Sequence, residues 1–157
     1  VADRMPDRIR ELVYLDAFVL EDGQCLHDTL PPPMRDSQLE QALSMGEGWK
    51  VPPIPAEVFQ VNAQDRDWVD RQCTMQPLAT FQQRLRLTGE NTKIENITFI
   101  LATGWAPSPF PHFYERAKAK GWRTVTMESG HDVMLDLPEE LTRELHAISV
   151  RHSTSAH

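Results

Sequence analysis

Three short runs of residues have the side-chain pattern of buried β-strands. Residues 11–18 and 97–102 are largely apolar, as expected of parallel strands that are covered on both faces. Residues 122–127 alternate bulky and polar side chains and are rich in β-branched types, which is typical of a strand. The order along the chain is strand, long connection, strand, helix, strand, helix. With right-handed connections, this order predicts a mostly parallel sheet in an α/β protein.

Two segments with helical spacing of apolar residues follow the second and third predicted strands. Residues 112–120 form the first, and Gly121 ends it, because glycine readily adopts the left-handed conformation found after helices. Residues 138–150 form the second. It begins with Pro138 and two acidic residues, which suits a helix start: proline loses no hydrogen bond there, and the acids face the positive end of the helix dipole.

The region between the first two predicted strands differs in kind from the rest of the chain. Proline clusters at 31–33 and 52–55 interrupt it, and short helices are predicted at 37–45 and 65–73. An insertion of this type between two strands is typical of a cap or lid over a site. The predicted organisation is a core of residues 1–25, a cap insertion of residues 26–75, a second core part of residues 76–150 and a polar tail of residues 151–157.

The third predicted strand leads into a turn that carries a histidine. Ser129 and Gly130 break the strand, and His131 follows them directly. Open α/β sheets build their sites at the carboxyl ends of strands, where this turn would lie. An imidazole held there can take a proton from a hydroxyl near neutral pH and return it to a leaving group. The alternative interpretation is a surface histidine in a turn.

Three stretches resemble the α/β-hydrolase superfamily, in particular its small esterase and hydroxynitrile-lyase-like branch. They are residues 10–24, 72–81 and 129–134, and the most specific is the last, which is followed by Pro138 and its acidic neighbours. In that family the last sheet strand is followed by the catalytic histidine, which the resemblance places at His131. The resemblance implies the carboxyl-terminal part of an α/β-hydrolase fold, a mostly parallel sheet flanked by helices with a helical cap insertion.

The resemblance also implies a nucleophilic serine on a Gly-x-Ser-x-Gly turn, and this sequence has no such motif. Its nearest approach, residues 43–46, lacks the first glycine and does not follow a strand-like run. The chain begins at Val1 with a stretch that resembles the end of the helix behind that turn. We therefore expect the 157 residues to be part of a longer hydrolase, to need its missing amino-terminal half as a partner, and to be inactive alone.

A catalytic histidine of this kind needs a carboxylate that fixes its tautomer and stabilises the imidazolium. Most family members carry the acid after the penultimate strand, but residues 103–111 contain neither aspartate nor glutamate. Some members carry it at the end of the strand before the cap, where Asp16 stands here. A carboxylate at the end of an apolar strand requires a partner. We expect Asp16 to be the acid, and its alternative roles are to cap the next loop or to pair with an arginine. Weaker candidates are Glu21, Asp22 and Glu115.

Together these residues imply a carboxylic ester hydrolase of the Ser-His-Asp type that acts on a small-molecule ester. Two alternatives remain: a hydroxynitrile-lyase-like C–C lyase, and a non-catalytic small-molecule-binding protein with the hydrolase fold. The lyase would use a lysine near the site. Lys50 and Lys93 are the only lysines in or near the predicted cap and neither lies in a recognisable motif, which favours hydrolysis. The expected substrate-binding residues are Trp49, Phe59, Trp68 and Trp105, whose alternative role is packing.

Composition and charge argue against several other classes of protein. The formal net charge of −7 and the pI near 5.3 disfavour nucleic acid and anionic membranes as partners, because both would be repelled. No run approaches the ~18 apolar residues that span a bilayer. Cys25 and Cys73 have no short-spaced partner and no zinc-ligand spacing. We expect no metal or cofactor and a cytoplasmic protein with reduced thiols, while one disulfide and a homodimer remain open.

Overall fold

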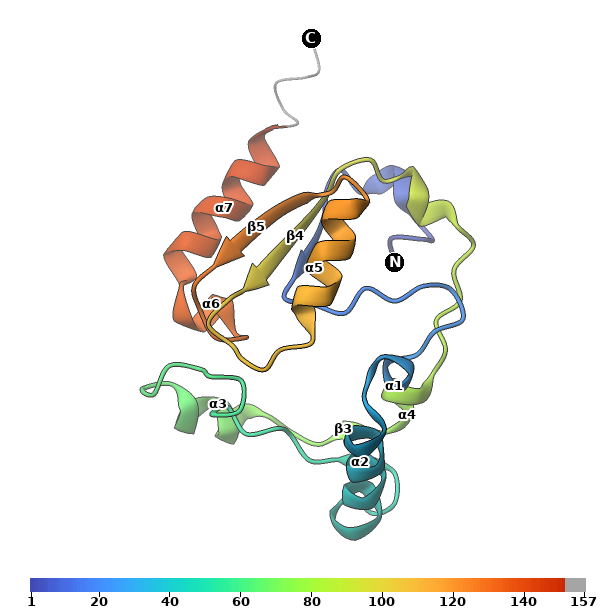
Figure 1. Cartoon of the computed structure of the whole chain (residues 1–157), viewed down its shortest axis with the longest axis vertical. Helices are drawn as coiled ribbons and strands as arrows, with labels where there is room; N and C mark the ends of the chain where they lie inside the picture. Colours follow the sequence, from blue (N-terminus) through green and yellow to red (C-terminus); the bar gives the residue numbers. More distant parts are fainter. Residues whose placement is uncertain (152–157) are drawn as a thin grey trace.

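A parallel three-stranded sheet is the central element of the computed structural model, which describes residues 1–151 (Figure 1). Its strands are β1 (Leu12–Leu15), β4 (Ile97–Ala102) and β5 (Arg123–Met127), in the order β1-β4-β5. Leu12 lies opposite Ile97 in one pair, and Ala102 lies opposite Met127 in the other. β4 is the most buried strand because it has a neighbour on each side.

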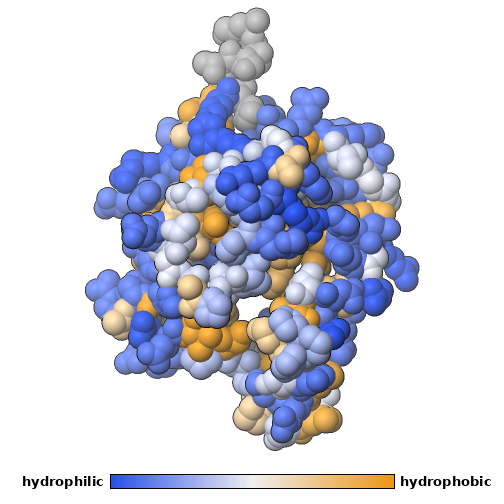
Figure 2. Space-filling model, viewed as in Figure 1, coloured by the Kyte–Doolittle hydropathy of each residue, from blue (hydrophilic) through white to orange (hydrophobic). Residues whose placement is uncertain are grey.

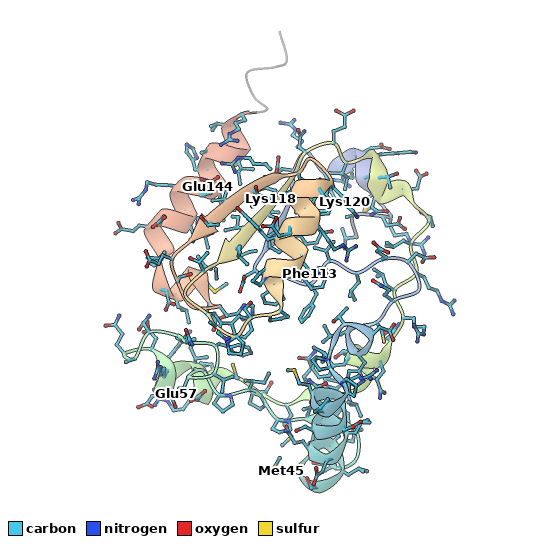
Figure 3. The ribbon with its side chains drawn as sticks, in the orientation of Figure 1. Met45, Glu57, Phe113, Lys118, Lys120 and Glu144 are labelled. Carbon is cyan, nitrogen blue, oxygen red and sulfur yellow. The ribbon has the colours of Figure 1, made fainter. Side chains whose placement is uncertain are left out.

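Helices cover both faces of this sheet. α5 (Phe110–Ala119) packs on Phe99 and Leu101 of β4, whereas α6 (Val133–Asp136) and α7 (Pro138–Arg151) pack on Ile100 and Ala102. This division follows from the alternation of side chains along a strand. Phe99 and Ile100 are fully buried, and burial of such a side chain contributes roughly 1.5–3 kcal/mol. The parallel sheet flanked by helices that the sequence predicts is therefore confirmed. Figure 3 shows Phe113 on α5.

Several observed elements begin or end a few residues from their expected limits. β1 ends at Leu15 rather than at residue 18, because Asp16 has a φ of 42° and turns the chain out of the strand. α5 begins two residues earlier than expected, and α6 is a four-residue helix that the sequence analysis does not predict. Arg151 belongs to α7, and the remainder of the expected polar tail lies outside the described residues.

Most of the connection between β1 and β4 lies below the sheet in Figure 1, and its last part runs back up beside the sheet. α2 (Pro32–Met45) and α3 (Arg66–Gln72) correspond to the two helices expected there. β2 (Lys50–Val51) pairs with β3 (Gln76–Pro77) in an antiparallel sheet of two strands. Ala56, Val61 and Val69 form a small core in this connection, and Leu135 of α6 packs against it. The other elements of the connection are α1 (Leu26–Thr29), α4 (Ala79–Gln82) and η2 (Glu90–Lys93), and a short η1 (Pro6–Arg8) precedes β1.

Much of the exposed apolar surface of the described chain belongs to this connection. On α2 only Ala42 is buried, and its neighbour Leu43 is 77% exposed. Figure 2 shows an opening between the sheet-bearing part and the connection, with hydrophobic residues on parts of its rim, and Figure 3 shows Met45 at the end of α2 far from the sheet. The exposed large apolar residues here are Met34, Leu39, Leu43, Met45, Trp49, Ile54, Val58, Trp68, Met75 and Leu85.

Three further properties of residues 1–151 bear on the class of protein. None of the helices in this range has the length and apolar character that crossing a membrane requires. Nowhere in the same range do three or more His, Cys, Asp or Glu side chains gather closely enough to hold a metal ion. Cys25 is buried, Cys73 is exposed, and both are free thiols.

The amino-terminal segment is held to the body by the buried carboxylate of Asp3. It accepts hydrogen bonds from the backbone N–H groups of Thr88 at 2.8 Å and Gly89 at 3.0 Å. The bond from the Thr88 backbone is the main reason that the pKa of Asp3 lies below its ordinary value. Because the folded-state pKa is lowered, this contribution to stability is present above the ordinary aspartate pKa of about 4 and is lost as the pH falls through the lowered pKa.

We therefore expect Asp3→Asn to remove part of the acid-induced loss of stability. The measurement is thermal unfolding of wild type and variant from about pH 6 down to about pH 2. The variant should lose less stability than wild type over this range. An identical acid-induced loss in both proteins would contradict the assignment.

Candidate active site

Asp16 and His131 meet at the carboxyl end of the parallel sheet. Asp16 directly follows β1, His131 follows β5, and β4 lies between these two strands. Asp16 Oδ2 lies 2.7 Å from His131 Nδ1, within the range of a hydrogen bond. A carboxylate can only accept, so Nδ1 carries the proton in this bond, and in the neutral imidazole Nε2 is then the proton acceptor. The structure thus joins the two residues that the sequence analysis singled out as base and acid.

The carboxylate of Asp16 is fully buried and has a partner for each oxygen. Oδ1 accepts a hydrogen bond from the backbone N–H of Ala102 at 3.0 Å, and Oδ2 faces His131. The backbone N–H of Asp16 donates to the carbonyl of Ile100 at 2.7 Å. These bonds attach the residue to β4 and fix the direction of its side chain, which satisfies the requirement of a buried carboxylate for partners.

Aromatic side chains surround the imidazole of His131, which is 26% exposed. The ring centroids of Trp105, Phe59 and Phe110 lie 4.8, 5.0 and 5.3 Å from that of the imidazole. Rings at these distances limit the contact of the imidazole with water and offer an apolar surface to a ligand. Phe59 and Trp105 are two of the four residues expected to bind substrate. The sequence analysis gave no such role to Phe110, which is the first residue of α5.

The other two expected substrate-binding residues lie in more exposed surroundings. Trp49 is 54% exposed with the ammonium of Lys50 5.2 Å from its ring centroid, and Trp68 is 51% exposed on α3. Within residues 1–151, neither ring is in aromatic contact with His131. Their contribution to substrate binding stays a prediction.

The weaker acid candidates point to other partners. Glu21 pairs with Arg116, and Glu115 pairs with Lys118 at 3.0 Å. Asp22 Oδ1 accepts a hydrogen bond from the backbone N–H of Leu87 at 2.7 Å. Asp132 precedes α6, and partial burial raises the pKa of its carboxyl group. Asp16 is thus the carboxylate that faces the His131 ring nitrogen.

His27 has a structural role that the sequence analysis did not assign. Its side chain is buried, its Nε2 lies 2.8 Å from Gln38 Oε1, and its ring stacks on Phe81 with centroids 6.1 Å apart. We expect His27→Ala to lower the free energy of unfolding by about 1–3 kcal/mol, because it leaves the Gln38 amide without its partner. Urea denaturation measures this, and the exposed His146→Ala serves as the control. Equal unfolding midpoints for the two variants would contradict it.

The chain is similar in sequence to one characterised hydrolase, although no family model matches it. The carbendazim hydrolyzing esterase of Nocardioides sp. (strain SG-4G) is 45% identical over 157 residues. The match covers 94% of this chain and 64% of the relative. The chain therefore spans slightly less than two thirds of the length of that esterase.

Two solved structures share the fold. An extracellular α/β-hydrolase from a Paenibacillus species, reported to share structural and functional homology with tobacco salicylic acid binding protein 2, matches with a TM-score of 0.73 and 18% identity over 96% of this chain and 64% of that chain. A pyrethroid hydrolase from Sphingobium faniae JZ-2 matches with a TM-score of 0.65 and 18% identity over 93% of this chain and 63% of that chain. At this identity the similarity is one of fold.

Proposed function

We propose that this chain, which has the α/β-hydrolase fold, carries the base and the orienting acid of a serine-type carboxylic ester hydrolase. The observation that carries this proposal is the 2.7 Å contact between Asp16 Oδ2 and His131 Nδ1 at the carboxyl end of the sheet. The 45% identity to an esterase supports the same reaction class. The proposal leaves the branch of the superfamily open.

In the proposed reaction His131 acts first as a base and then as an acid. Its Nε2 takes the proton of a serine hydroxyl while the serine oxygen attacks the ester carbonyl, and the same proton then passes to the leaving alcohol. Asp16 holds the proton on Nδ1, so that Nε2 stays free to accept, and its charge stabilises the imidazolium that forms. Water then releases the acid by the same sequence of proton transfers. The serine and the oxyanion donors are proposed to lie outside these 157 residues, which contain no Gly-x-Ser-x-Gly turn.

The surroundings of His131 support esters with a flat apolar group near the carbonyl. Phe59, Trp105 and Phe110 place three aromatic rings around the imidazole, where offset or edge-on contacts with another ring are favourable. Residues 26–75 are proposed to act as the cap that supplies Phe59 to this wall. The related esterase is named for carbendazim, which is therefore a substrate to test beside simple aromatic esters.

The lysines near the proposed cap favour hydrolysis over cyanohydrin cleavage. Lys50 Nζ pairs with Glu47 at 2.6 Å, and Lys93 pairs with Glu90. Both ammonium groups are thus engaged by neighbouring carboxylates on the same turn. The hydrolysis assay below distinguishes an esterase, which releases product, from a binding protein, which does not.

The test is hydrolysis of p-nitrophenyl butyrate and carbendazim by the full-length protein and by the 157-residue chain. We expect turnover by the full-length protein and none by the 157 residues, because the proposed nucleophile lies outside them. Tight binding of these compounds without product formation by the full-length protein would favour the binding alternative. Turnover by the 157 residues that disappears in His131→Ala would place the nucleophile within them and overturn that part of the proposal.

A further inference from the structure

Residues 58–62, which we call the strap, connect the segment between β1 and β4 to both loops of the candidate site. The indole Nε1–H of Trp105 donates to the carbonyl of Val58 at 2.8 Å. The backbone N–H of His131 donates to the carbonyl of Phe59 at 2.9 Å. The Gln60 side chain donates to the carbonyl of Ala106 at 3.1 Å. The strap therefore contacts the loop after β4 and the histidine loop after β5 at the same time.

One carboxylate, that of Asp136 at the end of α6, links the strap to the histidine loop. Its Oδ2 accepts the backbone N–H of Gly130 at 2.8 Å. Its Oδ1 accepts the backbone N–H of Asn62 at 2.9 Å and the Asn62 side-chain amide at 3.1 Å. Hydrogen bonds to an ionised carboxylate are roughly twice as strong as neutral ones. Gly130 directly precedes His131, so the carboxylate acts on the backbone that carries the imidazole.

The main chains of the strap and the histidine loop approach too closely for a side chain to fit between them. A Cβ on Gly130 would lie 2.3 Å from the carbonyl oxygen of Gln60 and 2.8 Å from Asp136 Oδ2. Gln60 itself has a φ of 56°, a conformation that turns the strap at this point. Loosening of the strap therefore removes the packing on one side of His131, including the Phe59 ring 5.0 Å away.

We propose that Asp136 is a positioning residue for His131, because it clamps the strap onto the histidine loop and so fixes the imidazole against Asp16. Neither Asp136 nor Asn62 touches the reacting atoms, so their effect passes through the backbone of residues 130 and 131. The kinetic part of this inference rests on the proposed function, whereas the position of the imidazole can be observed without any reaction. A displacement of a catalytic group by about 1 Å costs roughly 100-fold in rate.

The variant to test is Asp136→Asn in the full-length protein, because an amide at this position cannot accept from both Gly130 and Asn62. Glu139→Gln is the matched control: it removes the same charge three residues later, and its side chain is 90% exposed. We expect Asp136→Asn to lower kcat for p-nitrophenyl butyrate by roughly 10- to 100-fold, with KM changed less than about threefold. The control should retain the kcat of the wild type.

A second readout is the NMR resonance of the His131 Nδ1–H proton. The resonance is assigned by its absence from the spectrum of His131→Ala. A proton held between Nδ1 and a buried carboxylate is protected from exchange, so it should be visible in wild type and in Glu139→Gln. In Asp136→Asn it should shift upfield or broaden by exchange with water. If Asp136 had only a structural role in α6, Asp136→Asn would lower the stability of the protein without moving this resonance.

An Nδ1–H resonance in Asp136→Asn identical to that of the control would overturn the inference. If Asp136→Asn does not fold, Asn62→Ala provides the answer, because it removes the side-chain bond from the strap to Asp136 and keeps the backbone bond. It also removes the bonds between the Asn62 side chain and Asp65, so Asp65→Ala is its control. A change of the same sign in Asn62→Ala that is absent from Asp65→Ala supports the clamp, and no such change overturns it. If the wild-type protein hydrolyses no ester, the proposed function fails. The resonance then decides the positioning role by itself.

Discussion

Asp16→Asn should lower kcat of the full-length protein by about 10⁴-fold, by analogy with the same change in a serine protease. The asparagine oxygen can keep the hydrogen bond from the Ala102 N–H, so the sheet edge stays intact. Its NH₂ group, however, then faces His131 Nδ1 and donates to it. This favours the tautomer with the proton on Nε2, which cannot accept a proton from the serine.

The measurement is kcat for p-nitrophenyl butyrate, with circular dichroism as the check on folding. Asp22→Asn and Glu115→Gln are the controls, because their carboxylates bind the Leu87 backbone and Lys118 instead of an imidazole. Each should cost less than about tenfold. A loss below tenfold in Asp16→Asn, or a larger loss in a control, would show that another group orients the histidine.

His131→Ala should lower kcat by roughly 10³-fold or more, because no group remains that can take and return the serine proton. The same change leaves Asp16 Oδ2 buried without its partner, which costs about 1–3 kcal/mol of stability. Activity must therefore be measured well below the unfolding temperature of the variant.

His112→Ala is the matched control for this change. His112 is exposed near the start of α5, and its ring packs edge-on against Phe113. This variant should retain most of the wild-type kcat. If His112→Ala were the damaging change and His131→Ala the mild one, the base would be wrongly assigned.

The regular elements could be predicted from the sequence where local chemistry determines them. The continuous apolar run of β4 and the proline that starts α7 each act on their own segment, so their limits are close to the expected ones. The two-residue strands β2 and β3 and the four-residue helix α6 could not be predicted. Elements this short form because of the tertiary contacts around them, and their residues carry no periodic pattern.

Part of the candidate site could be predicted for a similar reason. A carboxylate that ends an apolar strand must find a partner, and parallel strands end at the same sheet edge, which left an arginine or the next loop as alternative partners of Asp16. The resemblance to the hydrolases singled out His131 among them. The contacts of Asp136 with Gly130 and Asn62 do not follow from the sequence. They depend on how residues 58–62 lie across two loops distant in the chain, and no local pattern marks that docking.

The most direct test of the central claim is the rate at which a fluorophosphonate probe labels the full-length protein, followed by intact-protein mass spectrometry. This probe reacts covalently with a serine whose proton is removed by an adjacent base. We expect one adduct on a serine of the wild-type protein, and labelling at least roughly 10³-fold slower in His131→Ala. Labelling of His131→Ala at the wild-type rate, or a catalytically active wild-type protein that forms no adduct, would contradict the assignment of His131 as the base of a serine hydrolase.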